Sequence, residues 1–258
     1  MKLILSLFPG IGLLDMAFEQ VFDGIAAIVR GPDLLWGGDI QRFHVPAGHF
    51  WGIIGGPPCQ AFSRLRYLNP LCGAKQGNQI PQYERVCTEA QPDWFLMENV
   101  PDAPEPVVAG YVVHSQIYNN RWAGGEQNRL RRFSFGTQEG RALRPDVALL
   151  EAPLRAYAVT SSERVVPVAL IRDGKGGHKR KRALGGPTIL GGHSAAPGQR
   201  DGGLVMSLEL MCELQGLPPD YLDGAPFTCH GKRKVVGNGV PLPMGLALAE
   251  AVKRAMGA

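Results

Sequence analysis

Residues 55–63 read GGPPCQAFS and place Cys59 directly after two glycines and two prolines. The apolar run 51–54 before them predicts a buried strand. Neither proline can donate a hydrogen bond to a sheet, so the turn can hold a thiol clear of the regular elements. A thiolate is a strong nucleophile, and nearby positive charge lowers the pKa of a thiol. The pattern predicts a nucleophilic cysteine, with a buried structural cysteine as the alternative.

A carboxylate and an amide end a second apolar run, FLMENVP at residues 95–101. Glu98 and Asn99 come directly after the apolar residues, so the carboxylate is expected to be partly desolvated and suited to donating or sharing a proton. The alternative is a carboxylate that turns out into solvent at the end of a strand.

Basic and amide side chains alternate in QNRLRR at residues 127–132. On a strand, Gln127, Arg129 and Arg131 would share one face. Such a face could bind a phosphate or the oxygen of a base, although exposed alternation of this kind also occurs without function.

Two glycine turns suggest contacts with a ligand. In LFPGIGLLD (7–15), Gly10 and Gly12 lie where a strand runs into a helix, which would let an adenosyl-type ligand approach the backbone. In VVGNGVPLP (235–243), a Gly-Asn-Gly turn before the last helix could place Asn238 against a ligand. A plain strand-to-helix turn and a plain Asn-Gly turn are the alternatives.

Short apolar runs separated by helical or loop segments indicate how these residues are positioned. This order predicts a doubly wound, Rossmann-like, mostly parallel α/β sheet. The expected strands are 3–8, 25–29, 51–56, 94–100, 111–118 and 131–136. Residues 137–205 are rich in Gly, Arg and Pro with one β run at 164–171, and a helix capped by Ser207 and ended by Gly216 follows.

Composition narrows the class of protein. The chain has 258 residues, 45% of them hydrophobic and 19% charged, and lacks an apolar run long enough to span a membrane. The five cysteines form no CxxC pair, which argues against a disulfide framework or a metal site and favours a reducing cytoplasm. The net charge is only +4, but basic clusters at 127–132 and 175–182 predict a localised contact with a polyanion.

Taken together and in order, these blocks resemble the DNA (cytosine-5) methyltransferases. The matching segments cover both ends of the chain and leave the interval 137–205, where the family has its variable target-recognition region. They are Phe8–Gly12, Gly55–Ser63, Glu98–Val100, Gln127–Arg131, Ser207–Gly216 and Gly237–Pro241.

The resemblance implies a class I methyltransferase fold and methyl transfer from S-adenosylmethionine to C5 of a cytosine flipped out of double-stranded DNA. Cys59 would attack C6, Glu98 would contact the ring N3 and the exocyclic amine, and Arg129 and Arg131 would hold the base oxygen and order the catalytic loop. The cofactor would be bound by Phe8, Gly10, Gly12, Asp39, Ile40, Pro57, Asn238 and Val240. The expected contacts with nucleic acid are Gln60, Ser63, Arg64, Gln127, Lys179, Arg180, Lys181 and Arg182, and no metal is expected.

The sequence departs from the family pattern mainly around the cofactor. Ser6 and Leu13 stand where the family has Asp and Gly, and only Asp33 is available as an acid for the ribose. Residues 77–86, GNQIPQYERV, replace an Asp-x-Arg-Gly segment, and Glu126 replaces a Pro. Cofactor binding and closure of the loop after Cys59 are therefore the expectations with the least sequence support.

We expect a catalytic and cofactor domain at 1–136 plus 232–258, and a small β-containing target-recognition region at 137–231 with a connecting helix at 207–216. The expected protein is a cytoplasmic monomer of bacterial or phage origin with no membrane contact. Methylation of transfer RNA and a catalytically silent DNA-binding homologue are the alternatives. A nicotinamide-dependent oxidoreductase is disfavoured because G-x-G-x-x-G is absent.

Overall fold

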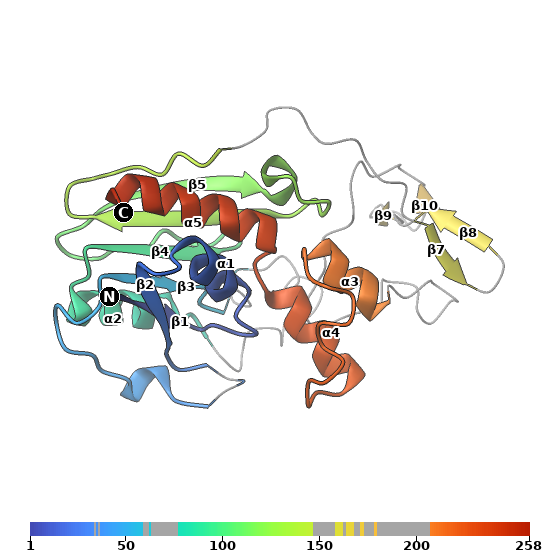
Figure 1. Cartoon of the computed structure of the whole chain (residues 1–258), viewed down its shortest axis with the longest axis horizontal. Helices are drawn as coiled ribbons and strands as arrows, with labels where there is room; N and C mark the ends of the chain where they lie inside the picture. The colour runs from blue at the N-terminus through green and yellow to red at the C-terminus, as the bar shows by residue number, and fades with distance from the viewer. Residues whose placement is uncertain are drawn as a thin grey trace. The chain divides into compact units, whose positions relative to one another are not determined.

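A computed structural model gives the fold of the chain (Figure 1). It describes residues 1–33, 35, 37–58, 62, 77–146 and 207–258, and the backbone of four short strands between 158 and 179. These residues fall into two compact units. One consists of Met1–Tyr118, Leu130–Asp146 and Gly245–Ala258, and the other of Asn119–Arg129 and Val147–Met244. The predicted domain boundaries stay a prediction.

The first unit is built on a six-stranded sheet in the order β2-β1-β3-β4-β6-β5. Its strands are β1 (Lys2–Leu7), β2 (Ala26–Arg30), β3 (Gly52–Gly55), β4 (Trp94–Asn99), β5 (Val112–Asn119) and β6 (Leu130–Thr137). The first four strands pair in parallel, and β6 runs antiparallel to β4. Because β1 lies between β2 and β3, the strand order reverses there. The prediction of a doubly wound, mostly parallel α/β sheet is confirmed.

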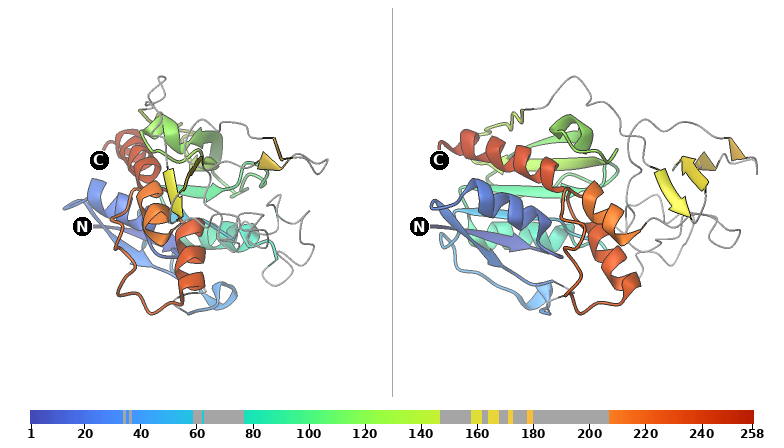
Figure 2. Two further views of the ribbon diagram at one scale, coloured as in Figure 1. Left: turned by 90° about the vertical axis from the view of Figure 1, so that its right-hand side faces the viewer. Right: turned by 45° about the vertical axis from the view of Figure 1, so that its right-hand side comes forward.

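Helices cover both faces of this sheet (Figures 1 and 2). Successive strand residues point to opposite faces, so Trp94 and Phe95 contact different helices. The Trp94 ring stacks on Phe18 of α1 (Leu13–Val21), and the Phe95 ring meets Tyr83 of α2 (Ile80–Ala90) edge-on. The last helix, α5 (Leu242–Met256), packs on the same face as α1, because Gly245 lies against Ala17.

Two glycines within the strands allow this aromatic packing. A Cβ atom on Gly52 or Gly136 would lie 2.2 Å from the ring of Trp94 or Phe95, respectively. Only glycine therefore fits at these positions, although glycine inside a strand is otherwise unfavourable. Both rings are fully buried and form the centre of the core.

The second unit contains α3 (Leu208–Leu214), α4 (Cys229–Asn238) and two short antiparallel strand pairs. The strands are β7 (Ala158–Ser161) with β8 (Arg164–Pro167), and β9 (Ile171–Arg172) with β10 (His178–Lys179). The Ser207 hydroxyl caps α3 by accepting from Leu210 N at 3.2 Å, as predicted.

One local prediction is wrong in this unit. Gly237 and Asn238 were expected in a turn, but they are the last residues of α4. The helix begins at Thr228, whose hydroxyl accepts from Gly231 N at 3.1 Å, and it continues until the extended Gly239. Capping by Thr228 therefore stabilises a helix that continues into Gly237 and Asn238, although their sequence is typical of a turn.

By length and composition alone, the segment Cys229–Met256 could cross a membrane. However, 61% of the most apolar stretch of this segment is buried inside the protein, as expected for helices that pack on a core. The segment also consists of two helices, α4 and α5, separated by residues 239–241.

Candidate active site

The predicted catalytic blocks of the first unit lie at one edge of its sheet. The carboxyl ends of β1, β3 and β4 meet there because these strands are parallel, and the antiparallel β6 begins at the same edge. Ligands of open α/β sheets bind outside these strand ends, next to the reversal of strand order. The blocks that begin at Phe8, Gly56 and Glu98 are thereby brought to one place.

The turn that leads to Cys59 is held against the end of β4. Asn99 Nδ2 donates to the Pro57 carbonyl oxygen at 3.2 Å, and Asn99 Oδ1 accepts from Val100 N at 2.9 Å. A Cβ atom on Gly56 would meet Glu98 Oε2 at 3.0 Å, so the turn passes directly over the carboxylate. A larger residue at this position would push that carboxylate aside by a few tenths of an ångström.

Cys59, Gln60, Ser63 and Arg64 lie outside the described residues, and their predicted roles stay predictions. The chain is nevertheless anchored on both sides of Cys59. Pro57 accepts from Asn99 on one side, and on the other Phe62 packs against the core cluster that includes Tyr83 and Phe95.

Glu98 forms an ion pair with Arg131. Glu98 Oε1 lies 2.8 Å from Arg131 Nε, and the two side chains are only 12% and 13% exposed. Interactions between charges are stronger in such partly desolvated surroundings than in water. The neighbouring Arg132 donates to the Pro101 carbonyl oxygen at 2.7 Å and pairs with Glu105, so it fixes the turn after β4.

Two other cysteines have the character of packing residues. Cys87 is completely buried in the core cluster that includes Tyr83, and burial raises the pKa of its thiol well above the ordinary value. Burial also raises the pKa of Cys212 to about 11, with nearby acidic residues adding to the shift. Neither thiol ionises near neutral pH, whereas Cys229 is exposed on α4.

The predicted cofactor turn has an unusual backbone. Phe8, Gly10 and Gly12 all have positive φ angles, of 56°, 57° and 77°. For Phe8 this conformation costs free energy, and such residues cluster at ligand sites. Gly10 N donates to Asp33 Oδ2 at 3.1 Å, so the acid considered for the ribose braces the glycine turn in this structure.

A buried polar network beside this turn was not predicted. Asp15 on α1 is fully buried and accepts from Ser6 Oγ at 2.5 Å and from Arg30 Nε at 2.8 Å. Ser6 is one of the positions at which the chain departs from the family pattern, and Asp15 supplies a carboxylate from the adjacent helix instead. The sequence contained no signal for this pairing, because the three residues lie on three different elements.

A pocket of about 480 Å³ opens at the end of β2, lined by Arg30, Gly31, Pro32, Gly37, Gly38 and Phe43. This volume is in the range that holds a nucleoside-sized ligand. Asp39 and Ile40, two predicted cofactor residues, begin the turn that carries Phe43. The Asp39 carboxylate caps this turn by accepting from Gln41 N at 2.9 Å, and Ile40 is buried.

The Gln127–Arg131 block does not form one strand face, which corrects the prediction of a shared face. β6 begins only at Leu130, so Gln127 and Arg129 belong to the second unit. Arg129 is 1% exposed and its Nη2 donates to the carbonyl oxygens of Gly237 and Gly239, at 2.9 and 3.1 Å. It therefore holds the backbone on both sides of Asn238.

Gln127 is completely buried and donates to the Leu214 carbonyl oxygen at 3.3 Å. A side chain in this position packs inside the second unit, and its predicted contact with nucleic acid is not supported. Gln215 completes this polar core by donating to the Val236 carbonyl oxygen at 2.5 Å. Asn238, the last residue of α4, is exposed, and Val240, two residues later, is buried.

The predicted basic cluster falls almost entirely outside the described residues. Lys179 lies on β10, of which the structure gives the backbone, and Arg180, Lys181 and Arg182 lie beyond the described residues. Among the described residues, no group of three or more His, Cys, Asp or Glu side chains could hold a metal ion.

Comparisons with known proteins bear directly on this arrangement. Residues 37–106, which include the Asp39 turn, the Pro57 turn and Glu98, match the family model of the C-5 cytosine-specific DNA methylases. Over these residues the chain is similar to those methylases. The resemblance predicted from the sequence is confirmed.

Individual relatives agree with this relationship. The chain is 30% identical over 178 residues to the Type II methyltransferase M.NgoPII of Neisseria gonorrhoeae, covering 63% of this chain and 46% of the relative. It is 31% identical over 161 residues to M.FnuDI of Fusobacterium nucleatum, covering 52% and 46%. The chain thus spans about half the length of the curated relatives it matches.

The fold also has close structural counterparts. The crystal structure of the S. pombe Dnmt2 methyltransferase superposes with a TM-score of 0.65 at 15% sequence identity, covering 98% of each chain. At this identity the similarity concerns the fold. The chain therefore has the fold of the class I methyltransferases, as predicted.

Proposed function

We propose that this protein transfers a methyl group from S-adenosylmethionine to C5 of a cytosine in double-stranded DNA, through a covalent bond between Cys59 and C6 of the base. The proposal is carried by the contact between the Cys59 turn and the end of β4. Asn99 holds Pro57 at 3.2 Å, and Gly56 lies directly against the Glu98 carboxylate. These contacts support the proposal that the nucleophile Cys59 and the Glu98 carboxylate act in one site.

The chemistry assigned to Cys59 follows from the weakness of C5 as a nucleophile. Addition of the Cys59 sulfur to C6 forms an S–C bond and makes C5 enamine-like, which divides a difficult step into easier ones. After C5 takes the methyl group, the C5 proton leaves and the S–C6 bond breaks. The base must leave the duplex for this addition, at a cost of about a few kcal/mol.

Glu98 and Arg131 are proposed to hold the base during this addition. Negative charge develops on the ring when sulfur adds to C6, and Glu98 would share a proton with N3, where that charge gathers, while accepting from the exocyclic amine. The guanidinium of Arg131, 2.8 Å from Glu98 Oε1, fixes the direction of that carboxylate and carries positive charge for the oxygen of the base. Such preorganised charges are worth more in a site closed to water than in solution.

The residues around the pocket at the end of β2 fit an adenosyl cofactor. Gly37 in the pocket lining and Gly10 in the nearby turn leave backbone open to a ligand, because a Cβ atom at either would meet nothing within 4 Å. Phe43 and Pro32 supply apolar walls for an adenine ring. S-adenosylmethionine, when bound, supplies an electrophilic methyl group. Phe8, Asp39, Ile40, Pro57, Asn238 and Val240 are the further residues proposed to hold it.

Double-stranded DNA is the proposed partner. The basic residues Lys179 to Arg182, with Gln60, Ser63 and Arg64, are proposed to contact it, as phosphate contacts supply most of the affinity of such proteins. We further propose that the enzyme acts in the cytoplasm as a monomer, in a restriction-modification or phage setting. Methylation of transfer RNA and DNA binding without catalysis are outcomes that the experiment below would reveal.

Methyl transfer by the purified chain from labelled S-adenosylmethionine tests this proposal. Duplex DNA and transfer RNA serve as alternative substrates, and bisulfite sequencing of DNA from expressing cells locates the methylated cytosines. We expect label in DNA with wild type and none with Cys59→Ala, while DNA binding persists. Cys229→Ala, which removes an exposed cysteine on α4, is the matched control and should retain activity. Label in transfer RNA alone, or full activity of Cys59→Ala, would refute the proposal.

A further inference from the structure

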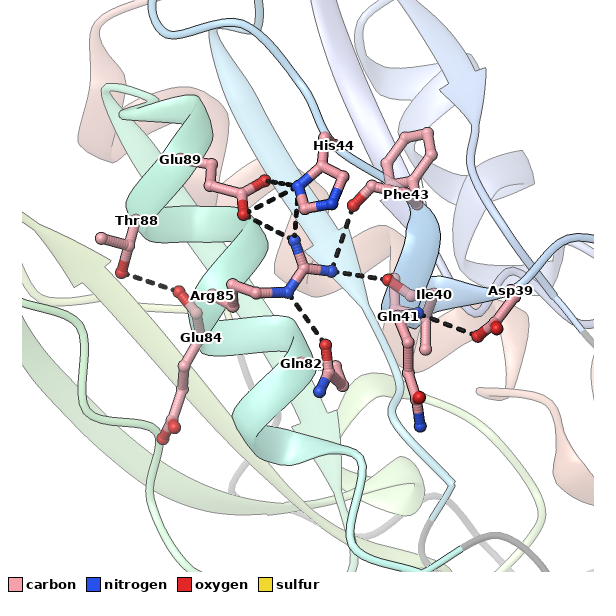
Figure 3. Close-up of polar contacts among 10 residues, drawn as sticks. All are labelled: Asp39, Ile40, Gln41, Phe43, His44, Gln82, Glu84, Arg85, Thr88 and Glu89. Carbon is pink, nitrogen blue, oxygen red and sulfur yellow. Dashed lines mark hydrogen bonds and ion pairs between the residues drawn. The ribbon is translucent and has the colours of Figure 1, made fainter.

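Arg85 on α2 is the centre of a polar cluster that joins this helix to the turn after Asp39 (Figure 3). Its Nη2 donates to the carbonyl oxygens of Ile40 and Phe43, at 2.6 and 3.1 Å. The side chain is 26% exposed, so these bonds are partly shielded from water. One guanidinium nitrogen thus holds both ends of the short helix Ile40–Arg42.

Three side chains orient the guanidinium from the other directions. Glu89, one helical turn after Arg85, accepts from Nη1 at 2.6 Å, and Gln82 Oε1 accepts from Nε at 2.9 Å. His44 Nδ1 lies 3.1 Å from Glu89 Oε1 and closes the cluster on the side of the turn. Bonds to Gln82 and Glu89 therefore orient Arg85 on α2, and its Nη2 is left to donate to the turn.

Besides the bonds from Arg85, apolar packing attaches the turn, since Ile40 is part of the core cluster and Phe43 packs against that cluster. Its internal hydrogen bonds join Gln41 N to the Asp39 carboxylate, and Arg42 N and Phe43 N to the carbonyl oxygens of Asp39 and Ile40. These are local bonds, which shape the turn without placing it on the protein. The burial of Ile40 and the two bonds from Arg85 attach it to α2.

The position of this turn determines one wall of the pocket at the end of β2. Phe43 lines that pocket, and its carbonyl oxygen is one of the two that Arg85 binds. Arg85 itself is absent from the lining. Any effect of Arg85 on a ligand in the pocket must therefore act through Phe43 and the turn.

We propose that Arg85 is a positioning residue for the cofactor: by binding the Ile40 and Phe43 carbonyl oxygens, it holds the Asp39–Phe43 turn where Phe43 and Asp39 can contact the adenosine part of S-adenosylmethionine. The inference rests on the proposed function. It also gives a role to residues 77–86, where the sequence departs from the family, because both Gln82 and Arg85 lie in that segment. A preformed pocket wall raises affinity by reducing the ordering required on binding.

The test compares Arg85→Gln with wild type. Titration calorimetry with S-adenosylhomocysteine gives the Kd, hydrogen exchange reports the amides of Gln41, Arg42 and Phe43, and initial rates give KM and kcat. We expect Arg85→Gln to raise the Kd and the KM for the cofactor about tenfold and to speed exchange at these three amides. The kcat at saturating cofactor should stay within about threefold, because no reacting group has been changed.

Two further variants separate positioning from general stabilisation. Arg141→Gln is the matched control, since Arg141 also pairs with a carboxylate, Glu139, and donates to a backbone carbonyl oxygen, that of Ala255 at 2.7 Å. It should lower stability while leaving the Kd unchanged. Arg85→Lys keeps the positive charge but lacks the planar fork, so we expect it to restore only part of the affinity.

The outcomes distinguish the inference from the proposed function. If wild type fails to bind S-adenosylhomocysteine, the proposed cofactor is wrong. If wild type binds it and Arg85→Gln binds equally well, with unchanged exchange at the three amides, Arg85 has no positioning role. An equal loss of affinity in Arg141→Gln would also overturn the inference, because general destabilisation would then account for the effect.

Discussion

At the scale of single residues, the close approach of Gly56 to Glu98 joins the two blocks on which the proposed chemistry depends. Gly56 leaves no room for a side chain beside Glu98 Oε2, since an added Cβ atom would lie 3.0 Å from it, while Arg131 pairs with Oε1. The carboxylate is thus confined from two sides. Its direction relative to the Cys59 turn is set by these neighbours and by the bond from Asn99 to Pro57.

Gly56→Ala tests this confinement. The new Cβ atom would lie 3.0 Å from Glu98 Oε2, so the carboxylate must shift by a few tenths of an ångström. We expect kcat to fall about tenfold or more, because small errors in positioning cost much of the rate. Gly224→Ala serves as control, since a Cβ atom there meets nothing within 4 Å. Steady-state methyl transfer measures both variants, and unchanged kcat in Gly56→Ala would show that the contact is unimportant.

The described cysteines give a second prediction at this scale. Alkylation requires the thiolate, and burial raises the pKa of Cys212 to about 11 and that of Cys87 well above its ordinary value. We expect iodoacetamide at pH 8 to modify the exposed Cys229 at least about a hundredfold faster than these two. Peptide mass spectrometry after timed quenching measures the rates. Equal rates at all three sites would contradict the packing role of Cys87 and Cys212.

At the scale of elements, the strands and the location of the site could be predicted because their signals are local. Continuous apolar runs identified β1, β3 and β4, and polar residues directly after them identified the edge where the site lies. Ser207 was predicted as a cap from its place before an apolar-periodic segment, and the Ser207–Leu210 hydrogen bond confirms it.

The remaining features could not be predicted because they depend on contacts between distant segments. The Asp15 network joins three elements, and the Arg85 bonds join residues more than forty positions apart. Arg129 alternates with Arg131 in sequence, but the strand begins between them, so the two side chains serve different units. Local periodicity contains no information about where a strand starts when the flanking residues are equally polar.

The Arg85 cluster gives a prediction about α2 and pH. Burial raises the pKa of Glu89, but hydrogen bonds from Arg85 and His44 outweigh it and leave this pKa below its ordinary value. A carboxylate whose pKa is lowered on folding stabilises the protein above its unfolded pKa of about 4.3, and this contribution is lost as the pH falls through the folded value.

Denaturant unfolding of wild type and Glu89→Gln between pH 3 and 7 checks this effect. Above about pH 5 the wild type should be more stable by a constant amount, and the difference should shrink below about pH 4.3. For comparison, Glu105→Gln removes a carboxylate of the same unit that pairs with Arg132. A difference that stays constant down to pH 3 would mean that Glu89 gains nothing from its partners.

At the scale of the whole molecule, the charge is distributed unevenly. The chain carries a net charge of only +4, yet five of the eight residues in the run 175–182 are Lys or Arg. A protein that binds DNA through localised phosphate contacts releases counterions there, so its affinity falls with salt in proportion to the number of contacts. The cluster Lys179–Arg182 is our proposed place for those contacts.

Replacing Lys179, Arg180, Lys181 and Arg182 with Gln should weaken DNA binding and flatten its salt dependence. The slope of log K against log salt should become shallower by about 0.9 for each phosphate that the variant no longer neutralises. Fluorescence anisotropy with a labelled duplex from about 50 to 300 mM salt, the range over which such affinities change steeply, measures this slope. Replacement of Lys232 and Lys234 on α4 is the control for a loss of positive charge elsewhere in the protein. An unchanged slope in the variant that lacks the Lys179–Arg182 cluster would mean that this cluster does not contact phosphates.

The covalent role of Cys59 is tested most directly with duplex DNA that contains 5-fluorocytosine at the target position. Fluorine at C5 cannot leave as a proton does, so after methyl transfer the bond between sulfur and C6 should persist. In the presence of S-adenosylmethionine, we predict a stable protein–DNA adduct that peptide mass spectrometry locates at Cys59 and that Cys59→Ala does not form. An adduct at another cysteine, or methylation of cytosine by Cys59→Ala, would contradict the account.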